Sequence, residues 1–149
     1  MPLTQGARQA YKLEQKLGWN TREPLVSLQD FADNLSSKYG TPPVTVSSSP
    51  NVRRAECLGV FKSPNKIILE PVTGQNKATV LHEFTHYLDF RDRKECPHDN
   101  KFRNRHRRLL KEMAASTNSR RSSGYNQQED IKPERKTLLG MLLNKARRN

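Results

Sequence analysis

The chain has 149 residues, enough for one small domain with tails, but only 33% of them are hydrophobic and the mean hydropathy is −0.93. We therefore expect part of the chain to lie outside the hydrophobic core. The sequence contains no apolar run long enough for a membrane span or a signal peptide, and its two cysteines, Cys57 and Cys96, suit a reducing compartment. These features favour a cytoplasmic protein and exclude a membrane partner or a disulfide scaffold.

Taken in chain order, residues 1–22 are predicted to be an extension with a helix over residues 4–17. Residues 27–30, Ser-Leu-Gln-Asp, have the form of a capping box at the start of a helix. Leucine and aromatic residues then recur at helical spacing until Gly40, which is typical of a helix end. We expect this helix to be the first element of a domain over residues 23–115.

A short strand is predicted over residues 44–46, after two prolines. Residues 57–70 predict a β-hairpin, because two apolar segments flank the polar turn at 62–66. A helix follows over about residues 76–91, with Asn76 or Thr73 as its N-cap. The fold class expected from this order is α+β, with a small antiparallel or mixed sheet.

The sequence His82-Glu83-Phe84-Thr85-His86 lies within this last helix. Positions i and i+4 share one face of a helix, so His82 and His86 can bind one metal ion. Glu83 lies about 100° further round and can hold a water molecule beside that ion. Burial of these three side chains without a metal would leave polar groups that are costly to satisfy. The pattern predicts a zinc hydrolase with one Zn²⁺ per chain.

A catalytic zinc ion needs a third protein ligand and an open position for water. We favour His98, which follows Pro97 at the predicted start of the next helix. The chain lacks the glycine turn that a metzincin needs after His86, and Glu112, the ligand a gluzincin would use, has no supporting neighbours. His106 is too far along the same helix to bind the ion together with His98, at about 12 Å, and is expected to pack on the apolar side. The remaining candidates are Asp89, Asp92 and Glu95.

The motif His82-Glu83-x-x-His86, followed by a polar loop and His98-Asp99-x-x-Phe102, resembles the SprT-like, or Spartan-type, metalloproteases. The resemblance covers about residues 25–113. It implies a minimal zincin-like domain in which a helix with the HExxH motif precedes a second helix that carries the third histidine. It also implies cleavage of proteins on or near DNA, and a strand beside the cleft that pairs with an extended substrate.

The expected activity is that of a zinc metalloendopeptidase, with Glu83 as the catalytic base and a protein or peptide as substrate. Two alternatives remain: a zinc-dependent nuclease, and a non-enzymatic nucleic-acid-binding protein with structural zinc. Asp89 can orient His86 or be an exposed helix residue, and Tyr87 is expected to pack rather than to offer its hydroxyl to the cleft.

The carboxyl-terminal part of the chain carries most of the positive charge. Residues 1–90 contain 10 basic and 8 acidic side chains, whereas residues 91–149 contain 17 and 7. Residues 116–149 are expected to form a flexible basic tail, with a linker over 116–130 and an amphipathic helix over 133–148. Non-specific binding to a nucleic-acid backbone, and hence association with nucleoid or chromatin, is predicted for a basic helix face made of Lys101, Arg103, Arg105, Arg107, Arg108 and Lys111.

Overall fold

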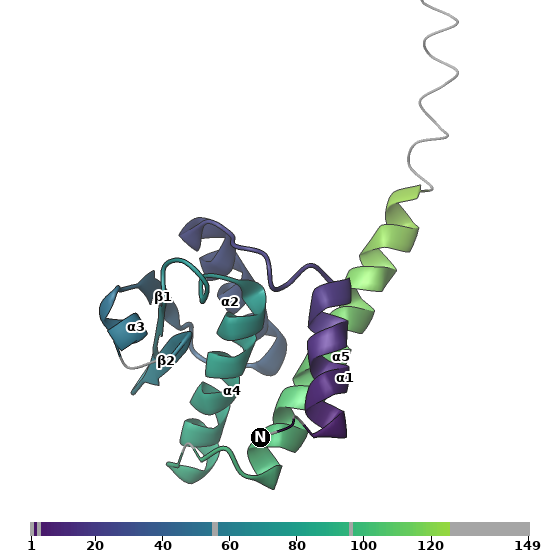
Figure 1. Ribbon diagram of the computed structural model, residues 1–149. Coiled ribbons are helices and arrows are strands. Elements are labelled where there is room, and N and C mark those ends of the chain that lie inside the picture. The colour runs from purple at the N-terminus through teal and green to yellow at the C-terminus, as the bar shows by residue number, and fades with distance from the viewer. Residues whose placement is uncertain (1, 3, 55–56, 96, 126–149) are drawn as a thin grey trace, which may run out of the picture. The chain divides into compact units, whose positions relative to one another are not determined.

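The computed structural model describes Pro2 and residues 4–54, 57–95 and 97–125 (Figure 1). The described elements are α1 (Gln5–Lys16), α2 (Leu25–Tyr39), β1 (Thr45–Ser48), α3 (Asn51–Arg54), β2 (Gly59–Lys62), β3 (Lys66–Leu69), α4 (Lys77–Arg93) and α5 (Asn100–Tyr125). The fold is therefore α+β, as predicted. The chain divides into two compact units, residues 1–111 and residues 112–149, so that α5 crosses from one unit into the other. Among the described residues, no helix has both the length and the apolar composition needed to cross a lipid bilayer.

Three short strands form a mixed sheet in the order β1-β3-β2. The central strand β3 pairs in parallel with β1 and antiparallel with β2. The β2–β3 pair confirms the predicted hairpin, with Lys62 opposite Lys66 at its turn. Because β3 lies between the other two strands, β2 is an edge strand.

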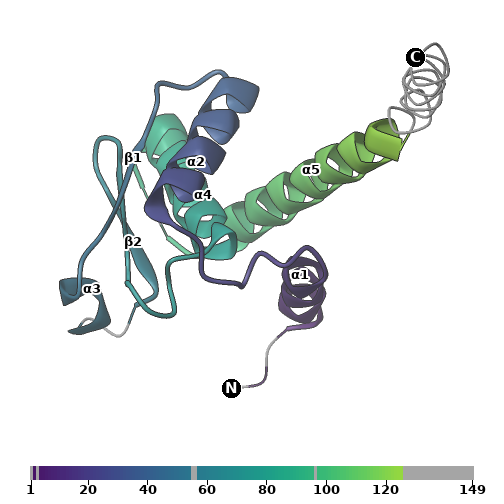
Figure 2. The same cartoon turned by 90° about the horizontal axis from the view of Figure 1, so that it is seen from above.

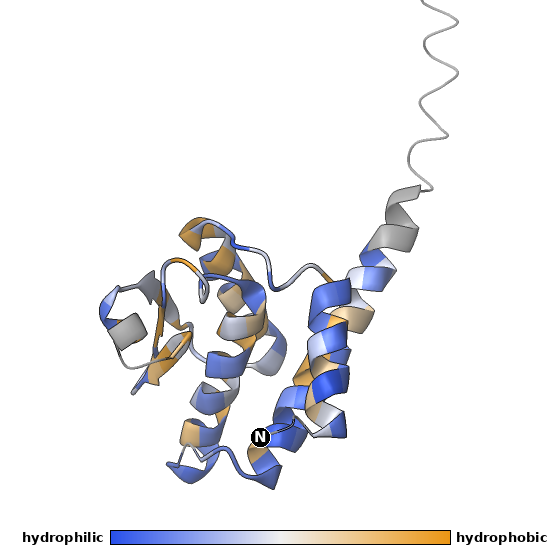
Figure 3. Cartoon of the chain, in the orientation of Figure 1, coloured by the Kyte–Doolittle hydropathy of each residue, from blue (hydrophilic) through white to orange (hydrophobic). Residues whose placement is uncertain are grey.

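Helices α2 and α4 pack beside each other on one face of the sheet (Figures 1 and 2), with α2 against β1 and α4 against β2 and β3. Hydrophobic residues are concentrated on the strands and on these helices, whereas α1 is mostly hydrophilic (Figure 3). The core contains completely buried side chains from both layers, including Leu28, Leu35, Ile67, Leu69, Val80, Leu81 and Phe84. Tyr87 is also buried, and its hydroxyl donates a hydrogen bond to the Pro42 carbonyl oxygen at 2.9 Å, so its predicted packing role is confirmed.

The amino-terminal start of α2 differs from the prediction. The helix begins at Leu25, after Pro24, whose carbonyl oxygen accepts the first helical hydrogen bond from the Leu28 N–H at 3.1 Å. Ser27 therefore lies inside the first turn, and its hydroxyl donates to Glu23 Oε2 at 2.7 Å instead of capping the helix. The capping-box prediction was wrong, whereas Gly40 does end the helix in the left-handed conformation, with a φ of 64°.

The outer side of β1 is covered by a side chain of α2. Gln29 Nε2 donates to the Val44 carbonyl oxygen at 2.8 Å, and Gln29 Oε1 accepts from the Val46 backbone N–H at 2.8 Å. The amide group thus takes the place of a neighbouring strand at these two residues. The strand itself begins one residue later than predicted and ends at Ser48.

The predicted amino-terminal helix is present as α1, with the Thr4 hydroxyl oxygen accepting from the Ala7 N–H at 3.3 Å. No residue of α1 is buried. Trp19, just beyond this helix, is only 4% exposed, and its ring meets Phe31 edge to face. Its carbonyl oxygen also accepts a hydrogen bond from the Ala78 N–H at 3.2 Å. Trp19 thus belongs to the core, although sequence analysis placed it in the extension.

The described part of the second unit is helical. Helix α5 runs through Tyr125, so residues 116–125, the first part of the predicted linker, are helical. Ser116 and Thr117 donate their hydroxyl hydrogens to the carbonyl oxygens four residues earlier, both at 3.0 Å, so these polar side chains are accommodated without ending the helix. The predicted helix over 133–148 lies outside the described residues.

Glu70 organises the turn between β3 and α4. The side chain is 2% exposed, and its carboxylate accepts hydrogen bonds from the Thr73 hydroxyl at 2.7 Å and from the backbone N–H groups of Val72, Thr73 and Gly74. These bonds, led by that of the Thr73 hydroxyl, lower the pKa of Glu70 to about 2. The charged form of Glu70 is therefore the form that stabilises the fold.

We expect Glu70→Gln to be less stable than the wild type near neutral pH. The folded-state pKa lies below the unfolded value of about 4.3. The stabilisation is therefore complete above that value and is lost as the pH falls towards about 2. The difference in thermal unfolding midpoint between the two proteins should shrink over this pH range. A difference that stays constant from neutral pH down to about pH 2 would contradict the role assigned to the carboxylate.

Candidate metal centre

Two of the three predicted metal ligands lie on α4. The helix begins after Asn76, whose side-chain oxygen accepts from the Thr79 N–H at 2.9 Å, which confirms one of the two predicted N-caps. His82 and His86 follow on one face, with their ring centroids 5.1 Å apart. The spacing of four residues therefore brings the two imidazoles together, as the sequence indicates.

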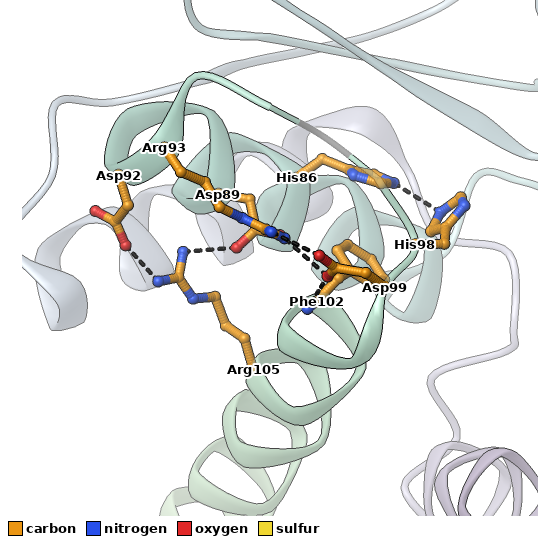
Figure 4. Close-up of polar contacts among 8 residues, drawn as sticks. All are labelled: His86, Asp89, Asp92, Arg93, His98, Asp99, Phe102 and Arg105. Carbon is orange, nitrogen blue, oxygen red and sulfur yellow. Dashed lines mark hydrogen bonds and ion pairs between the residues drawn. The ribbon is translucent and has the colours of Figure 1, made fainter.

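The third histidine approaches them from the loop before α5. His98 Nε2 lies 3.0 Å from His82 Nε2 and 2.9 Å from His86 Nε2 (the latter contact is drawn in Figure 4). His98 precedes α5 by two residues, rather than lying in its first turn as predicted. Asp99 is the N-cap of α5, because its Oδ1 accepts a hydrogen bond from the Phe102 N–H at 2.9 Å.

The three histidines can hold a metal ion. One potential ligand atom from each lies within 4.8 Å of the others, and within the described residues these three form the group that meets this criterion. A neutral imidazole has one N–H group and one lone pair, so three facing Nε2 atoms cannot all be satisfied by sharing hydrogens. A cation that accepts a lone pair from each resolves the conflict.

Burial keeps two of these imidazoles in the form that binds metals. Desolvation, together with smaller effects of the neighbouring imidazoles, lowers the pKa of His82 to about 3 and that of His86 to about 4, although the nearby Asp89 carboxylate acts in the opposite direction on His86. Both rings are therefore neutral near pH 7. Metal binding requires the neutral ring, so no proton has to be removed from either residue before an ion enters.

Aromatic side chains support the histidine rings. Phe102 stacks on His86 with ring centroids 4.4 Å apart and lies edge to face with His98 at 4.9 Å. His106 lies parallel to Phe102 at 6.2 Å, and its Nε2 is 3.9 Å from Glu14 Oε1. His106 is outside the group of three and packs beside it, in agreement with the prediction.

Glu83 is buried beside the histidines, with 6% of its surface exposed. Burial raises its pKa to about 7, although the Phe61 backbone N–H donates a hydrogen bond that lowers it. Strand β2 can approach this closely because of Gly59, where a Cβ atom would lie 2.7 Å from Thr79 Cγ2 and 3.1 Å from Glu83 Cγ. A carboxylate in this environment can accept and release a proton near neutral pH.

The histidines and Glu83 open onto a cleft of about 700 Å³. Strand β2 forms one wall, and α1 contributes Tyr11 and Glu14. Of the described residues that line the cleft, two are glutamates, Glu14 and Glu83, and none is lysine or arginine. The two residues from α1 were missed by sequence analysis, because α1 shows no motif and lies more than sixty residues before the histidines.

An ion-pair network connects α4 to the start of α5 (Figure 4). Asp89 is only 2% exposed and forms ion pairs with Arg93 at 2.8 Å and with Arg105 at 2.9 Å. It is therefore not the exposed helix residue that was one of its two predicted roles. Arg93 also binds Asp99, and this guanidinium holds the pKa of the Asp99 carboxyl well below its usual range.

The predicted basic face is largely exposed, with one exception. Arg105 is half-buried and forms ion pairs with Asp89 and Asp92, so its charge is neutralised within the fold. The guanidinium of Arg107 lies against Gly6 of α1. The exposed residues of the face are Lys101, Arg103, Arg107, Arg108 and Lys111.

Comparisons of this chain with models of protein families, with curated proteins and with solved structures find no match. The resemblance to SprT-like metalloproteases stays a prediction that depends on the two histidine motifs. The function must therefore be inferred from the chemistry of the site itself.

Proposed function

We propose that this chain is a zinc-dependent endopeptidase in which His82, His86 and His98 hold the ion and Glu83 is the general base. One observation carries the proposal: three imidazole nitrogens converge beside a buried carboxylate at an open cleft. Three protein ligands leave a position for water, whereas structural zinc sites are usually closed by four. This favours catalysis over a structural role for the metal.

When bound at such a centre, zinc acidifies a water molecule and polarises the carbonyl group of a substrate. His82, His86 and His98 would hold the ion. Glu83 accepts a proton from the attacking water as the new carbon–oxygen bond forms. It then gives this proton to the amide nitrogen as the carbon–nitrogen bond breaks, so that its charge is restored at the end of the cycle.

The walls of the cleft favour a polypeptide substrate over a nucleic acid. Strand β2 lines the cleft with Val60 and Phe61, and as an edge strand it can pair with an extended chain. A phosphodiester backbone would instead meet Glu14 and Glu83, with no lysine or arginine among the described lining residues to balance its charge. The zinc-dependent nuclease is therefore the weaker alternative.

The direct test is to incubate the zinc-loaded chain separately with an unfolded protein such as casein and with single-stranded RNA and DNA. Proteolysis that a chelator abolishes and added zinc restores is the expected result. Cleavage of nucleic acid alone would indicate the nuclease. Zinc binding without cleavage of either would indicate the structural role.

The exposed basic side chains of α5 support a second property, the binding of nucleic acid without sequence preference. Lys101, Arg108 and Lys111 recur at spacings that place them on one side of the helix. An array of this kind attracts a phosphate backbone through charge alone. We propose that it brings the protease to proteins bound on DNA.

The double variant Lys101→Gln/Lys111→Gln is expected to bind duplex DNA more weakly than the wild type. In plots of log affinity against log salt concentration, the slope should become shallower by about one for each lost phosphate contact. The matched control is Arg105→Gln, which should leave the slope unchanged because Arg105 is already paired with Asp89 and Asp92. If the double variant and the wild type give the same slope, the basic face does not bind DNA.

A further inference from the structure

His98 is the least constrained of the three histidines. His82 and His86 are fixed by the backbone of α4, whereas His98 is exposed and lies in the loop between α4 and α5. That loop begins at Lys94, which ends α4 in the left-handed conformation with a φ of 58°. Phe102 lies edge to face with the His98 ring at 4.9 Å, and a second contact from outside the loop holds the residue next to His98.

Arg93, the last residue of α4, makes that contact (Figure 4). Its Nη1 lies 2.6 Å from Asp99 Oδ2, and its Nη2 lies 2.9 Å from Asp99 Oδ1. The same Nη2 lies 2.8 Å from Asp89 Oδ2. Asp99 is adjacent to His98, and Asp89 lies one turn beyond His86 on α4. The guanidinium therefore joins the residue next to the third histidine to the helix that carries the other two.

We propose that Arg93 is a positioning residue for the metal centre, which holds His98 in place for binding through the bridge Asp89–Arg93–Asp99. The inference rests on the proposed metal function and adds a determinant of metal affinity that lies outside the ligand set. A planar guanidinium can bind one carboxylate through two parallel hydrogen bonds and still donate to a second carboxylate. Such a bridge restricts the loop before the ion arrives, so that less conformational entropy is lost on binding.

For the loss of Arg93, the bridge and simple electrostatics predict opposite changes in metal affinity. Removing a positive charge near a cation site should strengthen metal binding if charge alone matters. If Arg93 orders His98, removing Arg93 should instead weaken metal binding. Arg93→Gln therefore separates the two effects by the sign of the change.

The experiment measures the zinc dissociation constant by competition with a coloured chelator, using the full chain. Arg93→Gln is expected to bind zinc about 10–100-fold more weakly than the wild type, the usual effect of losing a group that orients a metal ligand. The matched control is Arg105→Gln, which removes the same charge from Asp89 but has no contact with Asp99. Its zinc affinity should equal or slightly exceed that of the wild type.

Zinc affinity at or above the wild-type value in Arg93→Gln would overturn the proposal. If Arg93→Gln does not fold, Arg93→Lys decides, because it keeps the charge but lacks the fork that binds two carboxylates. Affinity several-fold below wild type supports the bridge, whereas wild-type affinity refutes it. Failure of the wild type to bind zinc would instead refute the proposed function itself, so the two failures can be distinguished.

Discussion

Replacing Glu83 by glutamine is expected to lower the rate of peptide hydrolysis by at least about 100-fold, the lower end of the usual contribution of a general base. Glutamine has nearly the same shape and can still accept the hydrogen bond from the Phe61 N–H. It cannot take a proton from water, however. The fold and the zinc content should therefore remain those of the wild type, and the loss should appear mainly in kcat.

The measurement compares initial rates of casein cleavage for the wild type, Glu83→Gln and a control, Glu95→Gln. The control makes the same chemical change at an exposed carboxylate in the loop before His98. It should retain the wild-type rate. If Glu83→Gln cleaves as fast as the wild type, Glu83 is not the base and the proposed mechanism is wrong.

The second large effect is expected from His86→Ala, which removes a nitrogen that lies 2.9 Å from His98 Nε2. Elemental analysis should find about one zinc ion per wild-type chain and close to none in the variant. Loss of a ligand should reduce affinity by more than the roughly 10–100-fold that loss of an orienting group costs. Hydrolysis should disappear with the metal.

Stability provides an independent readout of the same change. Zinc present at 100 times its dissociation constant should raise the unfolding free energy of the wild type by about 2.7 kcal/mol. His86→Ala should show no such increase, and a chelator should remove it from the wild type. The control is His106→Gln. His106 packs 5.6 Å from His82, measured between ring centroids, but lies outside the group of three, so this variant should keep the stabilisation by zinc. A variant His86→Ala that still holds one zinc ion would show that another set of ligands is used.

Features determined by short-range pattern were predicted well from the sequence. The hairpin over β2 and β3 follows from two apolar segments around a polar turn, and the pairing of His82 with His86 follows from the helical repeat. The third histidine was also identified, because His98 stands beside a proline and just before a new apolar pattern. In each case the neighbours along the chain carry the information.

Features that depend on contacts between distant segments were not predicted. Nothing near Glu14 indicates that α1 borders the cleft, and nothing near Arg105 indicates that its charge is neutralised by Asp89 and Asp92. The capping box at Ser27 failed for a different reason. The Pro24 carbonyl oxygen already accepts the first helical hydrogen bond from the Leu28 N–H, and Glu23 provides a partner for the serine hydroxyl. Local motifs therefore predicted which three histidines lie close together, but not what surrounds them.

The amide of Gln29 also limits how this protein can self-associate. Molecules polymerise through their sheet edges only if each has two edge strands whose backbone N–H and C=O groups are free to pair with a neighbour. Here the backbone groups of Val44 and Val46 are already engaged by Gln29, so β1 offers no free hydrogen-bonding groups at these two residues. A strand from a second molecule would have to displace the Gln29 amide before it could extend the sheet on this side.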